Sequence, residues 1–440
     1  MATKDVKIGD GAPLKVHPLR DAVLGELHAR PFTPIETPKR VLHFGFLTDA
    51  AQPQADREAL AKLCVAHGLS APPPGAKHLR FAFDGLVLRW ECHAEFTTYT
   101  WEFGRGAAGG KLFEPPACTL AGPMGLVQQP GPLLVAVDLH LVADPDKSGA
   151  LEHVFDRASL AAAENSDGTA LFATDFQPDQ DGFVRVLVAN RGLDTERAGA
   201  LVQRVLELET YRTLALLGLP EAQKLAPAID RIEKRLAEVT DTMRQTTGLS
   251  DNHRLLDELI GLAADVEADT AKSQFRFGAT RAYNDIVRLR LETIGERKAG
   301  IYPTWTSFLA RRMAPAMRTS FTIEERQANL SRKLARAANL LRTRVDVAVE
   351  EQNRDLLTML NDRGRMQLRL QQTVEGLSVA AISYYLVGLV NYLLRGAHDA
   401  GYPVDPTIGT AISVPIVVVL VAFIVRRIRR RYREQVKADI

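Results

Sequence analysis

Two uncharged stretches near the C-terminus constrain this 440-residue chain more than any other feature. The first covers residues 376–394 and the second covers residues 406–425. At about 1.5 Å per residue, a helix of either length crosses a hydrocarbon layer of about 30 Å. We therefore expect two transmembrane helices joined by a short loop, residues 395–405. A pair of core helices in a soluble protein is the alternative interpretation.

Basic residues flank these stretches on one side only. The loop holds one arginine against Asp399 and Asp405, whereas arginines precede the first stretch and follow the second. Cytosolic segments are enriched in Lys and Arg, so we expect both chain termini in the cytoplasm and the loop in the periplasm. The tail, residues 426–440, is expected to contact anionic lipid, and a cationic collar around a channel mouth is its alternative role. Its arginines are Arg426, Arg427, Arg429, Arg430, Arg431 and Arg433.

The charge of the remaining chain argues against nucleic-acid binding. The formal net charge is +2, and the tail alone contributes more than this, so residues 1–425 are slightly acidic. Nucleic-acid-binding domains usually carry a basic face. The three cysteines, Cys64, Cys92 and Cys118, are far apart and form neither a disulfide framework nor a zinc motif. We expect a reducing, cytosolic setting for the bulk of the chain and no nucleic-acid partner.

The segment before the first span reads as a helical stalk. No proline occurs between residues 316 and 402, and Thr322 with Glu325 forms a capping-box pattern that predicts a helix start there. Apolar residues such as Leu330, Leu334 and Leu341 recur with an 11-residue period, which predicts nearly straight packing. Helical patterns at 221–246 and 250–299 supply partners. Residues 220–375 are therefore expected to form a long-helix bundle or stalk.

The N-terminal half reads as an α+β domain. Short stretches rich in β-branched and aromatic residues predict strands, and helical patterns fill 55–68 and 193–217. Asp84 and Gly85 between two of these stretches indicate a hairpin turn. The expected result is a cytosolic α+β domain, residues 1–219, with a mostly antiparallel or mixed sheet. Its predicted strands are 41–48, 79–83, 86–91, 94–103, 133–142 and 183–189.

Motifs for cofactors, metals and catalysis are incomplete. Gly104, Gly106 and Gly109 match a dinucleotide fingerprint, but the prolines at 115 and 116 leave no room for the helix that this motif needs. Strand alternation separates Cys92 from His93 and its acidic neighbours, so no metal site is complete. No hydrolase signature is present. We expect no cofactor, no metal and no enzymatic activity.

One polar segment near the N-terminus is the candidate ligand-binding element. The stretch from His17 to Phe32 places two prolines around about three helical turns. Its chemistry-bearing residues are His17, Arg20, Glu26, His28 and Arg30. A short capping helix, whose last-turn basic residues suit the helix dipole, is the structural alternative, and it is the favoured of the two interpretations.

Three segments together resemble one family of uncharacterised bacterial membrane proteins, the domain-of-unknown-function family 3422. They are HPLRDAVLGELHARPF at 17–32, FLARRMAPAMRT at 308–319 and QQTVEGLSVAAISYYLVGL at 371–389. The resemblance covers essentially the whole chain. It implies a bacterial membrane-anchored protein, and it implies no particular activity.

The layout is also similar to that of CorA-type magnesium channels. A cytosolic domain, a long helix into the first span, a short outer loop and a basic tail occur in the same order. The Gly-Met-Asn that follows the first span in those channels is absent, because Leu394 precedes Arg395-Gly396-Ala397. The resemblance implies a homo-oligomeric channel or transporter of an inorganic cation in the inner membrane, without the magnesium-selective motif.

A stripe of small and polar residues in the first span bears on that hypothesis. Gly376, Ala380, Ser383, Val387 and Asn391 share one helix face. In a ring of subunits this face could line a pore, and close helix packing through small residues is the alternative, slightly favoured interpretation. The rival function is a membrane-tethered scaffold or sensor whose cytosolic domain binds a partner or small ligand.

Overall fold

The computed structural model describes residues 16–20, 23–24, 32–49, 52–73, 75–104, 111–143, 151–403 and 405–438, except for the side chains of residue 53 and of those after Ile428. The chain divides into two compact units. The first unit comprises Met1–Thr242 and Asp257–Ala337, and the second comprises Met243–Leu256 and Ala338–Ile440. Each unit is described by itself.

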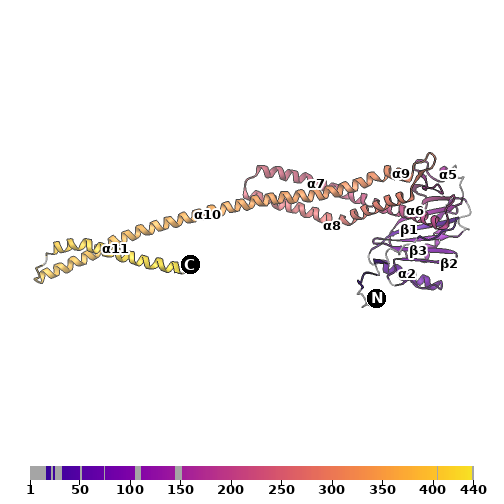
Figure 1. Cartoon of the computed structure of the whole chain (residues 1–440). Helices are drawn as coiled ribbons and strands as arrows, with labels where there is room; N and C mark the ends of the chain where they lie inside the picture. Colours follow the sequence, from indigo (N-terminus) through magenta and orange to yellow (C-terminus); the bar gives the residue numbers. More distant parts are fainter. Residues whose placement is uncertain are drawn as a thin grey trace, which may run out of the picture. The chain divides into compact units, whose positions relative to one another are not determined.

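A mixed nine-stranded sheet forms the centre of the first unit (Figure 1). Its order is β2-β3-β4-β1-β5-β8-β7-β6-β9, and every pairing is antiparallel except that of β5 with β8. The strands are β1 (Lys39–Leu47), β2 (His78–Phe83), β3 (Leu86–Cys92), β4 (Phe96–Phe103), β5 (Leu133–Val142), β6 (Ala161–Glu164), β7 (Ala170–Pro178), β8 (Val184–Asn190) and β9 (Arg297–Lys298).

Both faces of the sheet are covered, so the central strands are buried along their whole length. In β1, Leu42, Phe44 and Phe46 point into a cluster with Trp90 and Trp101. The intervening side chains point to the opposite face, where Val41 joins a second core with β5, β8 and the helices. Burial on both sides explains the continuous apolar pattern of these strands.

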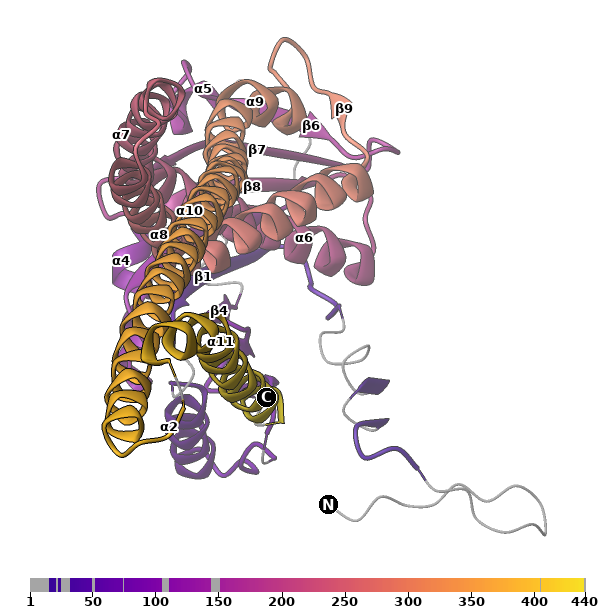
Figure 2. The same cartoon turned by 90° about the vertical axis from the view of Figure 1, so that its left-hand side faces the viewer.

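Helix α6 (Thr195–Leu216) crosses the second face (Figure 2). Asp194 caps its N-terminus by accepting a hydrogen bond from the Arg197 N–H at 2.7 Å. Leu201, Val205 and Leu208, spaced by four and three residues, are buried against the sheet. Shorter helices in the described part of the first unit include α2 (Gln52–Ala66), α4 (Ala117–Leu120), the 3-10 helix η1 (Gly122–Leu126), α5 (Leu151–Val154) and α9 (Trp305–Arg312).

Three long helices continue the chain: α7 (Gly218–Gln245), α8 (Leu249–Ile294) and α10 (Ala314–Asp399). Within the first unit they form a bundle. Arg326 on α10 binds Asp230 and Glu233 on α7, both at 2.6 Å, and Arg281 on α8 pairs with Glu324 on α10. Buried Leu330 and Leu334 lie on the inner face of α10, as the 11-residue period predicts.

The predicted helix start at Thr322 is wrong. Helix α10 begins at Ala314 and runs through Thr322 without interruption. Pro315 lies in its first turn, where proline is tolerated, and Met313 and Met317 are buried in the core. Tertiary packing therefore sets the start of the helix, and the capping-box pattern does not.

The second unit contains the rest of α10 and helix α11 (Pro406–Ala438). Leu341 and Val345 are buried, and Arg344 donates a hydrogen bond to the Met243 carbonyl at 2.6 Å. From residue 351 to residue 374 every side chain of α10 is exposed. Two helices, α10 and the part of α11 from Pro406 to Ile428, are long and apolar enough to cross a membrane. The expected α+β domain with a mixed sheet, followed by long helices with two candidate spans, is confirmed.

Candidate functional site

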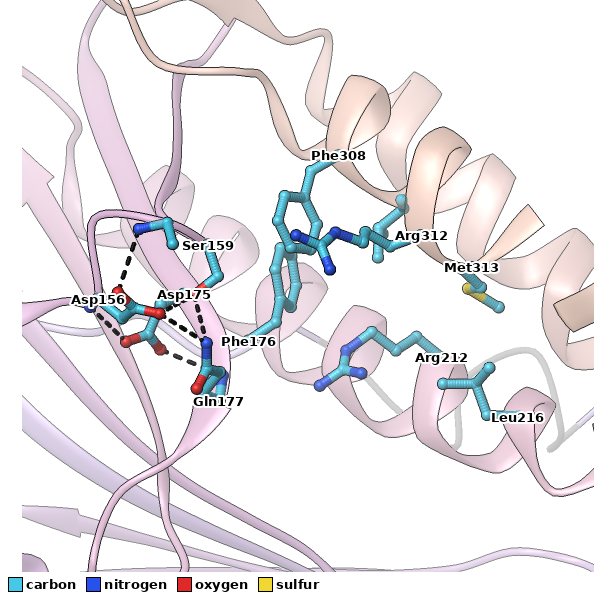
Figure 3. Close-up of a pocket in the computed structure, with 12 residues that line it drawn as sticks. Asp156, Ser159, Asp175, Phe176, Gln177, Arg212, Leu216, Phe308, Arg312 and Met313 are labelled. Carbon is cyan, nitrogen blue, oxygen red and sulfur yellow. Dashed lines mark hydrogen bonds between the residues drawn. The ribbon is translucent and has the colours of Figure 1, made fainter. Parts of the chain in front are cut away.

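A cavity of about 270 Å³ opens in the first unit where β7, α6 and α9 meet (Figure 3). The loop after α5 supplies Asp156 and Ser159, and β7 supplies Asp175, Phe176 and Gln177. Helix α6 contributes Arg212 and Leu216, and α9 with the residue that follows it contributes Phe308, Leu309, Arg312 and Met313. Segments more than 100 residues apart in the sequence therefore form one site.

Phe176 has an unusual backbone conformation at the centre of this cavity. Its φ is +56°, in the left-handed region that a bulky aromatic residue rarely adopts. The β7–β8 register shifts between Thr174 and Pro178, and the Thr174 hydroxyl accepts a hydrogen bond from the Phe176 N–H at 3.1 Å. Such a conformation costs about 1–3 kcal/mol and persists only where surrounding contacts impose it.

Those contacts are aromatic and cationic. The Phe176 ring stacks on Phe308 at a centroid distance of 5.0 Å, and it meets Trp305 edge-on at 5.1 Å. The Arg212 guanidinium lies 5.0 Å from the centre of the Phe176 ring. Arg312 lies similarly 5.8 Å from the centre of the Phe308 ring. The bulge therefore aims Phe176 into a cluster that also holds two arginines.

The opposite wall is polar and tightly hydrogen-bonded. The Asp156 carboxylate accepts bonds from the Ser159 hydroxyl at 3.1 Å and the Gln177 amide at 2.9 Å. Asp175 accepts from the Asp156 N–H at 2.9 Å. Hydrogen bonds from the Ala158 N–H and Ser159 lower the pKa of Asp156, so this carboxylate is ionised at neutral pH. The side chains of this wall are held in fixed orientations.

The cavity consequently carries opposite charges at its two ends. The carboxylates of Asp156 and Asp175 lie at one end, and Arg212 and Arg312 lie at the other, with the phenyl rings between them (Figure 3). Arg212 is already paired, because its Nε donates to Glu209 at 2.7 Å. Arg312 is exposed and makes no ion pair with any residue that the structure describes. Its charge is therefore available to an anionic group of a ligand.

The predicted ligand segment contributes nothing to this cavity within the described residues. His17 and Arg20 are exposed, and the His17 ring accepts a hydrogen bond from the Leu19 N–H at 3.2 Å. Glu26, His28 and Arg30 lie outside the described residues. The segment ends at Phe32, whose ring lies 5.0 Å from the Arg204 guanidinium on α6.

The stripe in the first candidate span lies partly against α11. The Thr410 hydroxyl donates to the Asn391 side-chain amide oxygen at 3.1 Å, and Ser383 is buried. A side chain at Gly409 would meet Leu394 at 2.8 Å, so the two helices approach closely here. Val387 is half-buried, whereas Gly376 and Ala380 are exposed.

The tail arginines are partly described. Arg426 and Arg427 are exposed on α11. Arg429, Arg430, Arg431 and Arg433 belong to the same helix, and their side chains lie outside the described part. No group of three or more His, Cys, Asp or Glu residues in the described segments could hold a metal ion.

Sequence reasoning missed the cavity altogether. Asp156 and Asp175 belong to no motif, and the loop and bulge that position them were not predicted. Arg312 lies in the segment at 308–319, which pointed to a family and not to a site. The polar turn from Asp156 to Ser159 is a weaker signal, because it is typical of many loops.

The comparisons with known proteins identify a family without a known activity. A family model described as "Protein of unknown function (DUF3422)" matches residues 15–432. This match confirms the family resemblance of the three sequence segments. Neither a curated protein nor a solved structure matches the chain.

Proposed function

We propose that this chain, which belongs to the DUF3422 family, is a membrane-anchored protein whose α+β domain binds a small zwitterionic ligand. The observation that carries the ligand part is the cavity with carboxylates at one end and arginines at the other. This is the sensor or scaffold hypothesis raised by the sequence, now with a site and a ligand class.

Exposure of apolar side chains supports the anchor. Leu389, Leu393, Val419 and Phe423 are each at least 59% exposed, whereas a core helix of a soluble protein would bury such residues. Lipid tails are the partner that would cover them. The exposed Arg426 and Arg427, which follow the apolar part of α11, favour a cytoplasmic position for the tail, in a bacterial inner membrane with both termini on the cytoplasmic side.

An ion channel with a CorA-like layout is the second candidate, and it rests on the order of the elements. In a single chain, Asn391 is bonded to Thr410, which favours helix packing over a pore lining. The two hypotheses differ in liposomes. A channel conducts a cation and loses that flux in an Asn391→Leu variant, whereas an anchor conducts none.

Association of copies is a further part of the proposal. Leu356, Met359, Leu370 and Val374 are exposed on α10, and they extend the stripe that is buried at Leu341 and Val345. In a homo-oligomer, the same face of a neighbouring copy would cover them. Mass measurement of the detergent-solubilised protein tests this.

The ligand class follows from the charges that the protein leaves available. Arg312 offers a guanidinium to a carboxylate, and the oriented Asp156 and Asp175 offer acceptors to an ammonium group. The phenyl rings between them suit an apolar body. A ligand with both charges, such as an amino acid or a short peptide, forms ion pairs at both ends of the cavity. A ligand with a single charge forms one at only one end.

Calorimetric titration of the full-length chain with the dipeptide dialanine tests the proposal. We expect Arg312→Gln to weaken binding about tenfold or more, because a charge-assisted hydrogen bond is lost. Arg311→Gln is the matched control, since Arg311 is an exposed neighbour on the same helix that does not line the cavity. N-acetylated dialanine lacks the ammonium group and C-amidated dialanine lacks the carboxylate. The wild-type chain should bind each of them about as weakly as Arg312→Gln binds dialanine. Equal affinity of the wild type for all three peptides would refute the proposal of a zwitterionic ligand.

A further inference from the structure

A second cavity, of about 180 Å³, lies between the sheet and α6 in the same unit. Strands β1, β3 and β4 contribute His43, Arg89 and Thr98 to it. Helix α6 contributes Gln203 and Glu207, and α8 contributes Arg290. No residue lines both this cavity and the one between β7 and α9.

Arg89 is deeply buried, and only part of its guanidinium has a partner. Its exposed fraction is 5%. Nη1 donates to the Gln203 side-chain oxygen at 3.1 Å, but the buried Nε donates to no described residue. An unsatisfied buried donor destabilises the folded state, more so when it is charged, so native structures rarely leave one.

Arg40, in the neighbouring strand β1, shows how this sheet satisfies a buried guanidinium. Its Nε and Nη2 donate to the two Asp138 oxygens at 2.9 and 2.6 Å, and its Nη1 donates to the Pro115 carbonyl at 2.6 Å. In Arg89, Nη1 donates to Gln203, as Nη1 of Arg40 does to Pro115, but Nε has no acceptor among the described residues. Nε belongs to the edge of a guanidinium that suits a two-oxygen anion.

Thr98 supplies a second unsatisfied donor on the cavity wall. Its exposed fraction is 2%, and its hydroxyl has no hydrogen-bond partner in the described part of the chain. Its neighbours are fixed, because Gln203 donates to Glu207 at 3.0 Å and Arg290 pairs with Glu207. Glu91 and His93 also line the cavity, and each has an interaction of its own.

We propose that this cavity is a second ligand site, which binds a small carboxylate or phosphate oxyanion on the Nε/Nη2 edge of Arg89 and the hydroxyl of Thr98. The volume suits a small anion. The bound oxygens supply the acceptors that Asp138 supplies to Arg40. The site is independent of the zwitterion cavity, because its residues are different.

Thermal unfolding of the full-length chain, purified without phosphate, tests this proposal. Inorganic phosphate and succinate are the two probes, each compared with chloride at equal ionic strength. At about ten times its Kd, the bound anion should raise Tm by about 2–4 °C. The probe that gives the larger shift identifies the class of oxyanion.

Two variants separate the site from general salt effects. Arg89→Gln should abolish the shift, and Thr98→Val, a change of similar shape, should weaken binding about tenfold. Arg80→Gln is the control. Arg80 lies opposite Arg89 in the β2–β3 register but does not line the cavity, so the Tm shift should remain in this variant. The proposal is overturned if neither probe shifts the wild type, or if Thr98→Val and Arg89→Gln respond as the wild type does.

Discussion

Replacing Asp138 by alanine is expected to lower the free energy of unfolding of the α+β domain by about 3–5 kcal/mol. Arg40 and Asp138 are both fully buried and are joined by two hydrogen bonds, at 2.9 and 2.6 Å. Removing the carboxylate leaves the guanidinium charge in the core without compensation. Urea unfolding followed by tryptophan fluorescence measures the change, because Trp90, Trp101 and Trp305 are all buried in this unit.

The matched control removes both charges. A double variant, Arg40→Met with Asp138→Leu, leaves no uncompensated charge and should recover most of the lost stability. A loss below about 1 kcal/mol in Asp138→Ala would contradict the proposed role of the pair. A double variant as unstable as the single variant would show instead that shape at this position matters more than charge.

Acid should destabilise the same domain through two buried histidines. Burial, with the nearby Arg89 charge, lowers the pKa of His43 to about 3, and burial with Arg40 lowers the pKa of His140 to about 3. Below pH 6.5 the unfolded chain binds protons that the folded chain does not. Stability should therefore fall by about 1.4 kcal/mol per pH unit for each histidine between pH 6.5 and pH 3. The two together amount to about 5 kcal/mol between pH 6.5 and 4.5.

Urea midpoints measured from pH 7 to pH 4.5 check this expectation. His43→Asn removes one of the two groups and should reduce the slope by about 1.4 kcal/mol per pH unit. In the wild type, the neutral His43 ring is hydrogen-bonded through Nδ1 to the Thr100 hydroxyl at 2.8 Å and through Nε2 to the Thr210 hydroxyl at 2.9 Å. Because the variant disturbs these bonds, it is less stable at pH 7 as well. An unchanged slope would mean that His43 takes up protons in the folded state near its ordinary pKa.

The sequence predicts most strands because their patterns are local. Burial on both faces makes β1, β5 and β8 nearly continuous apolar runs, and the turn at Asp84-Gly85 joins β2 to β3 with both residues at positive φ. Strands β6, β7 and β9 escaped prediction. The Ala161–Glu164 segment has helical rather than strand propensity, and β9 is two residues long, so only their neighbours in the sheet define them.

Neither cavity was predictable, because each depends on contacts between distant segments. The arginines at 212 and 312 meet only after α9 has folded onto α6, and a positive φ at Phe176 has no sequence signature in an aromatic residue. Arg89 reads as an ordinary strand residue until the sheet pairing places it beneath α6. Alternation predicts which side chains share a face, but it does not predict which face is covered by a helix.

Alkaline carbonate extraction of membranes from cells that express the full-length chain tests the anchor most directly. A matched chain ending at residue 375 keeps the α+β domain and the bundle, and lacks both apolar helices. The full-length chain should stay in the membrane pellet, and the shortened chain should be released into the supernatant. Release of the full-length chain would contradict the account, because helices surrounded by lipid tails are not extracted by a change of pH.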